Sequence, residues 1–271
     1  VAIFRRLGVP HRLRNLVEGE SLLNDGTGVV LFTIALTATQ GGFSIPSAAL
    51  DFIRLTVGGL ALGGALGLVL SRITGFVDDP QVEITLTAVA AYGGYLAGET
   101  LHVSGILTVV AAGLVIGNYA RQRRMSERTR QAVETMWDYV AFALNAAVFV
   151  LIAGVVPVQV VIDHAAAVLA GAAALLAARA MTVYGLVNLL RPLRRPLGLR
   201  SQHLLAWGGL RGAVAIALLL SLPPEILGFD TLRAVIYGAV LSSILVQGVL
   251  LVPLTRLLLP PLARNGENRL T

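Results

Sequence analysis

Eight long apolar segments, separated by short polar connections, constrain this chain more than any other feature of its sequence. Each is close to the ~20 residues that an α-helix needs to cross a lipid bilayer, and no strand-like alternation competes with them. Only 13% of the residues are charged, about half the fraction typical of soluble domains. We therefore predict an all-α membrane protein, a polytopic helical bundle. The segments cover residues 16–39, 48–71, 82–99, 103–119, 136–156, 165–189, 203–222 and 231–258.

Arginine alternates between the connections. It is present around residues 5–14, 72, 121–130, 191–200 and 256–269, and absent from 39–47, 100–102, 157–164 and 223–230. Connections that hold arginine face the cytoplasm in membrane proteins. Eight spans with this alternation place both ends of the chain in the cytoplasm, in a multi-pass protein of the inner or plasma membrane.

Several function classes are disfavoured by what the sequence lacks. It contains no cysteine, and no zinc-protease, P-loop or dinucleotide-binding motif. The net charge of +6 is explained by the arginine-containing connections, so we expect a lipid bilayer and not nucleic acid as the partner. No cofactor is expected. An intramembrane enzyme would need a nucleophile–base pair or two converging carboxylates at depth. Ser104 and His102 lie near a turn, so we expect no enzyme.

Four ionisable residues fall deep inside the apolar segments: Glu20, Asp25, Arg179 and Arg211. Such a residue costs about 3 kcal/mol or more at the bilayer centre and usually marks a functional site. Two acids and two bases at similar depth can neutralise one another. Static ion pairs that fix helix register are the alternative explanation, favoured for Glu20 and Arg211, level for Arg179 and disfavoured for Asp25.

Asp25 has oxygen-bearing neighbours. Glu20 and Asn24 are four residues apart and share one helix face, as do Ser21 and Asp25. Small hard cations prefer oxygen ligands of this kind, and a carboxylate at mid-depth is also a proton acceptor. We predict a cation- and proton-binding site at Asp25, Asn24 and Ser21, with a transported sodium ion at Asp25.

A cluster of three glycines surrounds Arg211: Gly208, Gly209 and Gly212. Glycine weakens a helix, and transporters use interrupted helices to expose main-chain dipoles at a central site. Close packing of an intact helix through small residues explains the cluster equally well. Glu99, at the outer end of its segment, could line an external cation vestibule, although a hydrated helix-end charge is the commoner case.

Two motifs carry a family resemblance. LVEGESLLNDGTGVVLF, residues 16–32, resembles the ion-binding helix of the monovalent cation:proton antiporters of the NhaP/NHE type. WGGLRGAVAIAL, residues 207–218, resembles the glycine-arginine motif of the same family. SGILTVVAAGLVIGNY and ARAMTVY are similar to further family segments, so the resemblance spans essentially the whole chain.

The resemblance implies the sodium/proton antiporter (NhaA-like) fold, with inverted repeats, a moving core domain and a dimerisation domain. It implies that Asp25 is alternately protonated and cation-loaded, that Asn24 and Ser21 support it, and that Glu20 pairs with Arg211. Arg179 and the three glycines would support the core. Residues 1–271 would form one transmembrane transporter domain, the C-terminal part of a larger one that lacks about five N-terminal helices here and is a homodimer at full length.

The expected function is secondary antiport of a monovalent cation, with sodium favoured, against protons, in electroneutral exchange that serves pH and sodium homeostasis. A potassium/proton antiporter, or another ion channel or transporter of this architecture, such as an anion pathway built around Arg179 and Arg211, is the alternative. A non-transporting scaffold is disfavoured, because buried charges would be an unnecessary cost to it.

Overall fold

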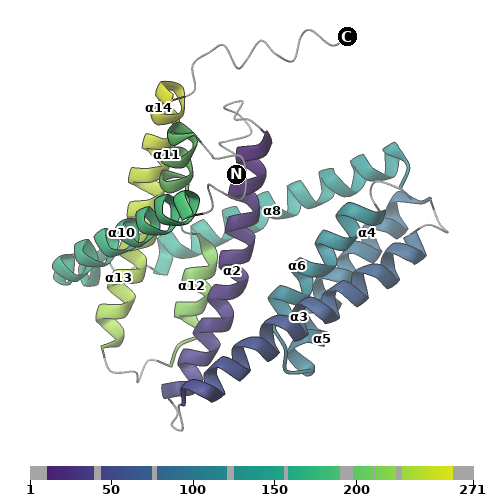
Figure 1. Ribbon diagram of the computed structural model, residues 1–271, viewed down its shortest axis with the longest axis horizontal. Helices are drawn as coiled ribbons and strands as arrows, with labels where there is room; N and C mark the ends of the chain where they lie inside the picture. Colours follow the sequence, from purple (N-terminus) through teal and green to yellow (C-terminus); the bar gives the residue numbers. More distant parts are fainter. Residues whose placement is uncertain are drawn as a thin grey trace. The chain divides into compact units, whose positions relative to one another are not determined.

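The computed structural model describes eight stretches of the chain, and regular structure within them is helical throughout (Figure 1). The stretches are residues 11–39, 44–74, 78–120, 125–155, 158–189, 198–209, 212–223 and 228–258. They confirm the predicted all-α fold. Within them, four helices are long and apolar enough to cross a membrane by length and composition: Leu13–Thr39, Ile45–Thr74, Ala165–Leu189 and Phe229–Leu258.

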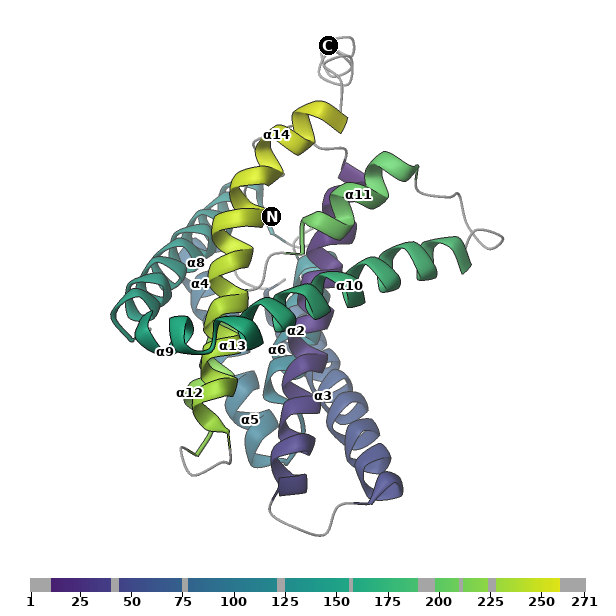
Figure 2. The same ribbon diagram turned by 90° about the vertical axis from the view of Figure 1, so that its left-hand side faces the viewer.

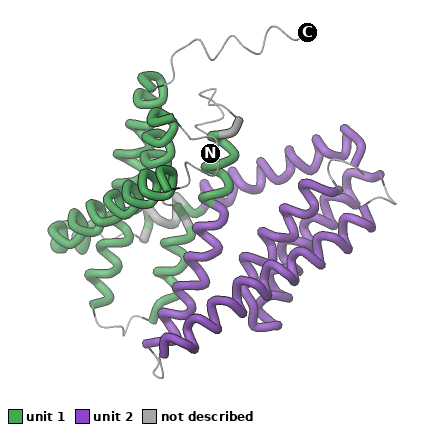
Figure 3. The backbone as a smooth tube through the Cα atoms, viewed as in Figure 1, with its two compact units in different colours: residues 1–21, 148–271 green, residues 22–147 purple. Residues whose placement is uncertain are grey.

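The chain divides into two compact units (Figure 3). The first contains Val1–Ser21 and Val148–Thr271, and the second contains Leu22–Ala147. Two helices continue from one unit into the other: α2 (His11–Thr39) and α8 (Glu127–Val155). Each unit is therefore described by itself.

The second unit is built around a hairpin that packs on one long helix. A continuous helical run passes from α4 (Pro80–Ala88) through the π-helical turn η1 (Val89–Gly93) into α5 (Gly94–Thr100). A turn at residues 101–103 then leads into α6 (Gly105–Val115) and the π-helical turn η2 (Ile116–Ala120), so that the two arms form a tight hairpin.

Side-chain caps fix where the helices of this hairpin begin. Asp79 accepts hydrogen bonds from the main-chain N–H groups of Gln81 and Val82, and Pro80 occupies the first helical position. Both residues are favoured at a helix start. Ser104 caps α6 in the same way by accepting from the N–H of Leu107. Each arm of the hairpin therefore begins at a capped helix end.

Glycines at four-residue spacing let α3 (Ile45–Thr74) approach α6 closely. A Cβ atom at Gly59 would come within 2.8 Å of the Ser104 carbonyl oxygen, and one at Gly63 would overlap the Thr108 carbonyl. Gly67 lies against Ala112 one turn further on. Small residues in this pattern are typical of close helix pairs in membranes.

The first unit contains helices that cross one another. Its elements are α9 (Val158–Asp163), α10 (Ala165–Leu189), α11 (Leu199–Trp207), α12 (Ala213–Leu220), α13 (Phe229–Ser242), the π-helical turn η3 (Ser243–Gly248) and α14 (Val249–Leu258). Figure 2 shows α10 crossing α13. At this crossing Gly171 lies against Val235, and Gly238 lies against Val168.

Two apolar clusters hold this unit together. One joins the start of α2 to α10, α11 and α14 through Leu13, Val17, Val183, Leu204 and Leu251. The other joins α12 to α13 through Ile216, Leu219, Tyr237 and Val240. In the middle of α11, His203 forms a 2.6 Å hydrogen bond with Tyr184 of α10. These contacts place the start of α2, α10 and the end of α11 around one point.

Candidate functional site

The predicted ion-binding residues lie together on α2. Glu20, Ser21 and Asn24 are half-buried and Asp25 is exposed, all within one uninterrupted helix. Asn24 follows Glu20 by one helical turn, so the two share a face. The hydroxyl of Thr27 donates to the main-chain carbonyls of Leu23 and Asn24, at 2.8 and 3.3 Å.

Glu20 forms a bidentate ion pair with Arg179 of α10. Nη1 of the guanidinium donates to one carboxylate oxygen at 2.9 Å, and Nη2 donates to the other at 3.0 Å. The Arg179 side chain is 11% exposed and the Glu20 side chain 38%. Paired charge-assisted bonds of this geometry are among the strongest in proteins.

The same guanidinium also satisfies the broken end of α11. Its Nε donates to the Ala206 carbonyl at 3.0 Å, and Nη2 donates to the Leu205 carbonyl at 2.9 Å. The last carbonyls of a helix have no partner within that helix, and their dipoles favour a cation. Arg179 therefore replaces the hydrogen bonds that the next helical turn would supply, and its charge is balanced by Glu20.

The predicted segment 203–222 is interrupted where the glycines cluster. Helix α11 ends at Trp207, and the N–H of Gly208 still bonds to the Leu204 carbonyl at 2.8 Å. Gly212 has an extended backbone, and α12 begins after it. The structure thus favours the interrupted helix over the intact one. Arg211 lies outside the described residues, so its pairing with Glu20 stays a prediction.

Gly209 lies against the guanidinium group. A Cβ atom at this position would overlap Nε and Cζ of Arg179. Only a residue without a side chain leaves room for the guanidinium to reach the carbonyls behind it. The close approach gives Gly209 a specific role that its place in a glycine cluster did not reveal.

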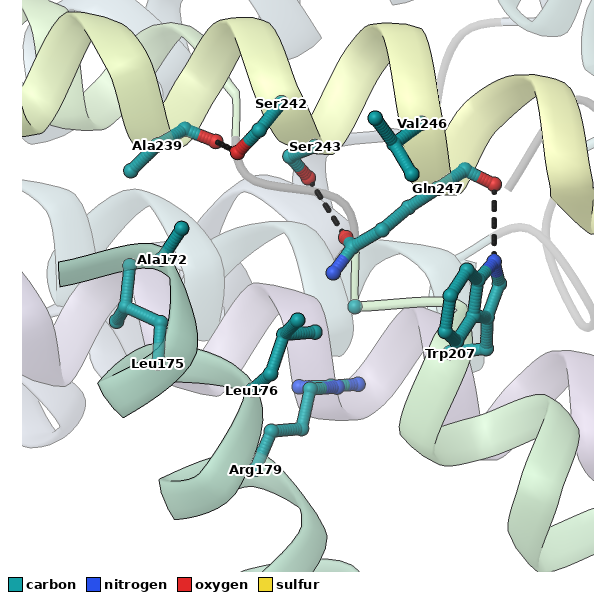
Figure 4. Close-up of a pocket in the computed structure, with 11 residues that line it drawn as sticks. Ala172, Leu175, Leu176, Arg179, Trp207, Ala239, Ser242, Ser243, Val246 and Gln247 are labelled. Carbon is teal, nitrogen blue, oxygen red and sulfur yellow. Dashed lines mark hydrogen bonds between the residues drawn. The ribbon is translucent and has the colours of Figure 1, made fainter. Parts of the chain in front are cut away.

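A cavity of about 110 Å³ lies beside Arg179 within the first unit (Figure 4). It is lined by apolar side chains of α10, including Leu176, and by Trp207. Polar side chains from the region of η3, Ser243 and Gln247, complete it. Sequence reasoning did not single out Trp207, Ser243 or Gln247.

A second pocket, of about 220 Å³, lies within the second unit. Glu99 and His102 line it together with Thr33, Tyr95 and Ser104. The structure thus places Glu99 beside a cavity that contains several polar groups. Whether a cation passes it stays a prediction.

Part of this site had no signal in the sequence. The partners of Arg179 include two main-chain carbonyls, which every residue carries, so no residue type marks them. Glu20 and Arg179 both stood out as charges at similar depth. Which base meets which acid depends on how α10 packs against α2, and this was not encoded in spacing.

Comparison with known proteins identifies relatives over almost the whole chain. Residues 1–257 match the model of a family described as sodium/hydrogen exchanger, transmembrane. The chain is 38% identical over 252 residues to the Na⁺/H⁺ antiporter ApNhaP of Aphanothece halophytica. It is 37% identical over 256 residues to the low-affinity Na⁺/H⁺ antiporter NhaS1 of Synechocystis sp., and 38% identical over 265 residues to the Na⁺/H⁺ antiporter NhaP of Pseudomonas aeruginosa.

These alignments cover this chain much more fully than they cover the relatives. They include 92%, 92% and 94% of the chain, but 48%, 49% and 62% of the three relatives. The chain thus spans about half the length of the first two.

Proposed function

Because the chain belongs to the sodium/hydrogen exchanger family, we propose that it carries the ion-binding part of an antiporter that exchanges sodium ions for protons. The names of its relatives, all Na⁺/H⁺ antiporters in the comparisons above, support sodium as the cation. In this proposal the sodium ion is cargo that binds and leaves, and the protein holds no resident metal.

One observation carries the assignment of Asp25 as the exchange group. Of the two acids of α2 that were predicted to lie deep in the membrane, Glu20 is held by both of its oxygens against Arg179, whereas Asp25 is exposed. A carboxylate in a bidentate ion pair with arginine is a poor site for a proton or a sodium ion, because the guanidinium already neutralises its charge. The exchange role therefore falls to Asp25, with Asn24 and Ser21 supplying neutral oxygens.

Exchange then follows from competition at one carboxylate. Asp25 binds a sodium ion or a proton, and the loaded protein moves between states open to opposite sides of the membrane. Each ligand drives this movement only through its different affinity for the two states. Since Asn24 carries no charge, the site has one ionisable group, which favours electroneutral exchange of one sodium ion for one proton.

The experiment is sodium-driven proton flux in vesicles that contain the full-length protein with Asp25→Asn. We expect flux to be lost, because the amide cannot take up a proton, and to survive in part in Asp25→Glu, which keeps the carboxyl group. Sodium, lithium, potassium and chloride are varied separately to identify the cargo. Sodium-dependent flux at the wild-type rate in Asp25→Asn would contradict the assignment of Asp25 as the exchange group.

We also infer that both ends of this chain are cytoplasmic and that the full-length protein is a homodimer. The alternation of arginine between the connections supports the first inference, and the family resemblance supports the second. Residues 1–271 contain no cysteine, so a cysteine introduced among them can be labelled with a membrane-impermeant thiol reagent, which reports the side of the membrane that it faces. Arg128→Cys should react only from the cytoplasm and Ser44→Cys only from outside. A monomeric mass in detergent and in lipid nanodiscs would contradict the dimer.

A further inference from the structure

The helix that runs from Phe229 to Leu258 contains a π-helical turn, η3, in its middle. Such turns are rare, widen the helix locally and are frequent at functional sites. Within η3, the side chain of Ser243 donates to the side-chain oxygen of Gln247 at 2.8 Å. The main-chain carbonyl of Gln247 accepts a hydrogen bond from the ring N–H of Trp207 at 3.2 Å (Figure 4).

Trp207 is the last residue of α11, so this hydrogen bond acts at the helix break. The two carbonyls immediately before it, from Leu205 and Ala206, accept from Arg179. The end of α11 is thus held from two directions, by the guanidinium and by η3. The two carbonyls that accept from Arg179 would bond to the next turn in an uninterrupted helix.

The cavity beside Arg179 makes the hydrogen bond between Trp207 and Gln247 important. Its space of about 110 Å³ borders Arg179, Trp207 and Gln247, so close packing does not hold the guanidinium on that side. The side chain keeps its place through directed hydrogen bonds. If the end of α11 moved, the carbonyls of Leu205 and Ala206 would move with it and Arg179 would lose half of its acceptors.

We propose that Trp207 and Gln247 are positioning residues for ion binding. By holding the end of α11 on η3, they keep the Arg179 guanidinium against Glu20, one helical turn before Asn24 on the same helix. They touch neither the cation nor the proton. This inference rests on the proposed function, because it concerns the affinity of the site on α2.

The test removes the ring N–H of Trp207 and keeps its bulk. Benzothienylalanine, which has sulfur in place of the ring N–H, is introduced at position 207, and Trp207→Phe is made in parallel. The other tryptophan gives a matched control, since Trp137 donates its ring N–H to Thr87 at 2.9 Å within the second unit. The same two replacements are made there. Sodium-driven proton flux of the full-length protein in vesicles is measured against sodium concentration and pH.

We expect both replacements at Trp207 to raise the KM for sodium about fivefold to tenfold, the value of one hydrogen bond. The pH of half-maximal rate should shift, and the maximal rate should stay within about twofold of wild type. The replacements at Trp137 should leave KM and the pH profile unchanged. They should lower the unfolding temperature about as much as the replacements at Trp207 do. Gln247→Met keeps the main-chain acceptor, so its KM should rise less.

The proposal is overturned if benzothienylalanine at position 207 leaves KM and the pH profile at wild-type values, or if position 137 gives the same shifts. A loss of protein with Trp207→Phe alone does not decide the matter, because benzothienylalanine keeps the packing and supplies the answer. Failure of the proposed function looks different. In that case the wild-type protein itself shows no sodium-dependent proton flux.

Discussion

Both units contain glycine-rich helical segments, and the glycines act differently in each. In the second unit they recur every four residues along the unbroken helix α3, at Gly59, Gly63 and Gly67. In the first unit they cluster between α11 and α12, at Gly208, Gly209 and Gly212. Regular spacing keeps the internal hydrogen bonds of the helix and shortens the distance to its neighbour. Clustering ends the helix and leaves main-chain carbonyls that need a donor.

This difference separates a packing surface from an electrostatic site. The carbonyls that α6 presents to the glycines of α3 remain within an intact helix. The carbonyls at the end of α11 accept instead from Arg179, which brings a charge and therefore a counter-ion, Glu20. Changes at the glycine cluster of the first unit should therefore alter ion affinity, and changes at the α3 glycines of the second unit should alter stability alone.

The largest expected effect comes from Arg179→Ala, which should abolish transport. It leaves the carboxylate of Glu20 and the carbonyls of Leu205 and Ala206 without their donor. The loss of unfolding free energy should be less than the ~3–5 kcal/mol reported for breaking fully buried pairs, because the Glu20 side chain is 38% exposed. Arg179→Lys keeps the charge but not the forked geometry, and should retain only part of the activity.

Thermal stability and flux are measured for Arg179→Ala, Glu20→Gln and the double variant. Coupled residues give a double variant that is less damaged than the sum of the single ones. If the effects of the two single substitutions simply add, the ion pair does not organise the site. The glycine cluster of the first unit would then differ from the α3 glycines in its geometry but not in an electrostatic role.

Glycine substitutions should give a smaller effect that differs in kind between the units. Gly209→Ala places a Cβ atom on the Arg179 guanidinium, so it should raise the KM for sodium roughly tenfold, as expected from losing one or two hydrogen bonds. Gly63→Ala crowds the Thr108 carbonyl and should lower stability by about 1–3 kcal/mol without changing KM. Gly64→Ala, which meets nothing within 4 Å, is the control.

The two measurements are the sodium dependence of flux and the unfolding temperature in detergent. Gly64→Ala should be neutral or slightly stabilising, since alanine favours a helix more than glycine does. The comparison between the units breaks down if Gly63→Ala raises KM as much as Gly209→Ala does.

The sequence predicted the helices better than it predicted their contacts. The described parts of the predicted apolar segments are helical, because segment length and hydropathy are local properties. The glycine cluster around Arg211 left an intact and an interrupted helix open, and the structure resolved the choice. The bonds from Arg179 to main-chain carbonyls, and from Trp207 to Gln247, had no signal, because they depend on distant segments meeting at groups that all residues share.

The smallest expected effect concerns a polar contact of the second unit outside the membrane-spanning segments. Asp78, in the connection between α3 and α4, accepts a 2.8 Å hydrogen bond from the buried hydroxyl of Thr129. Hydrogen bonds from the Ser126 side chain and from Thr129 hold the pKa of Asp78 below its ordinary value near 3.8.

A carboxyl group with a lowered pKa in the folded state stabilises the protein at pH values above its unfolded pKa. This contribution is lost as pH falls through the folded pKa. We therefore expect the unfolding temperature of the wild-type protein to decrease as the pH is lowered past about 4. The decrease should be shallower in Asp78→Asn, which cannot titrate at this position. At neutral pH this variant should unfold slightly earlier than wild type, with its KM for sodium unchanged. Parallel curves for the two proteins from neutral pH down to about pH 3 would show that the contact contributes nothing. A changed KM would instead mean that the contact between Asp78 and Thr129 affects the ion site on α2.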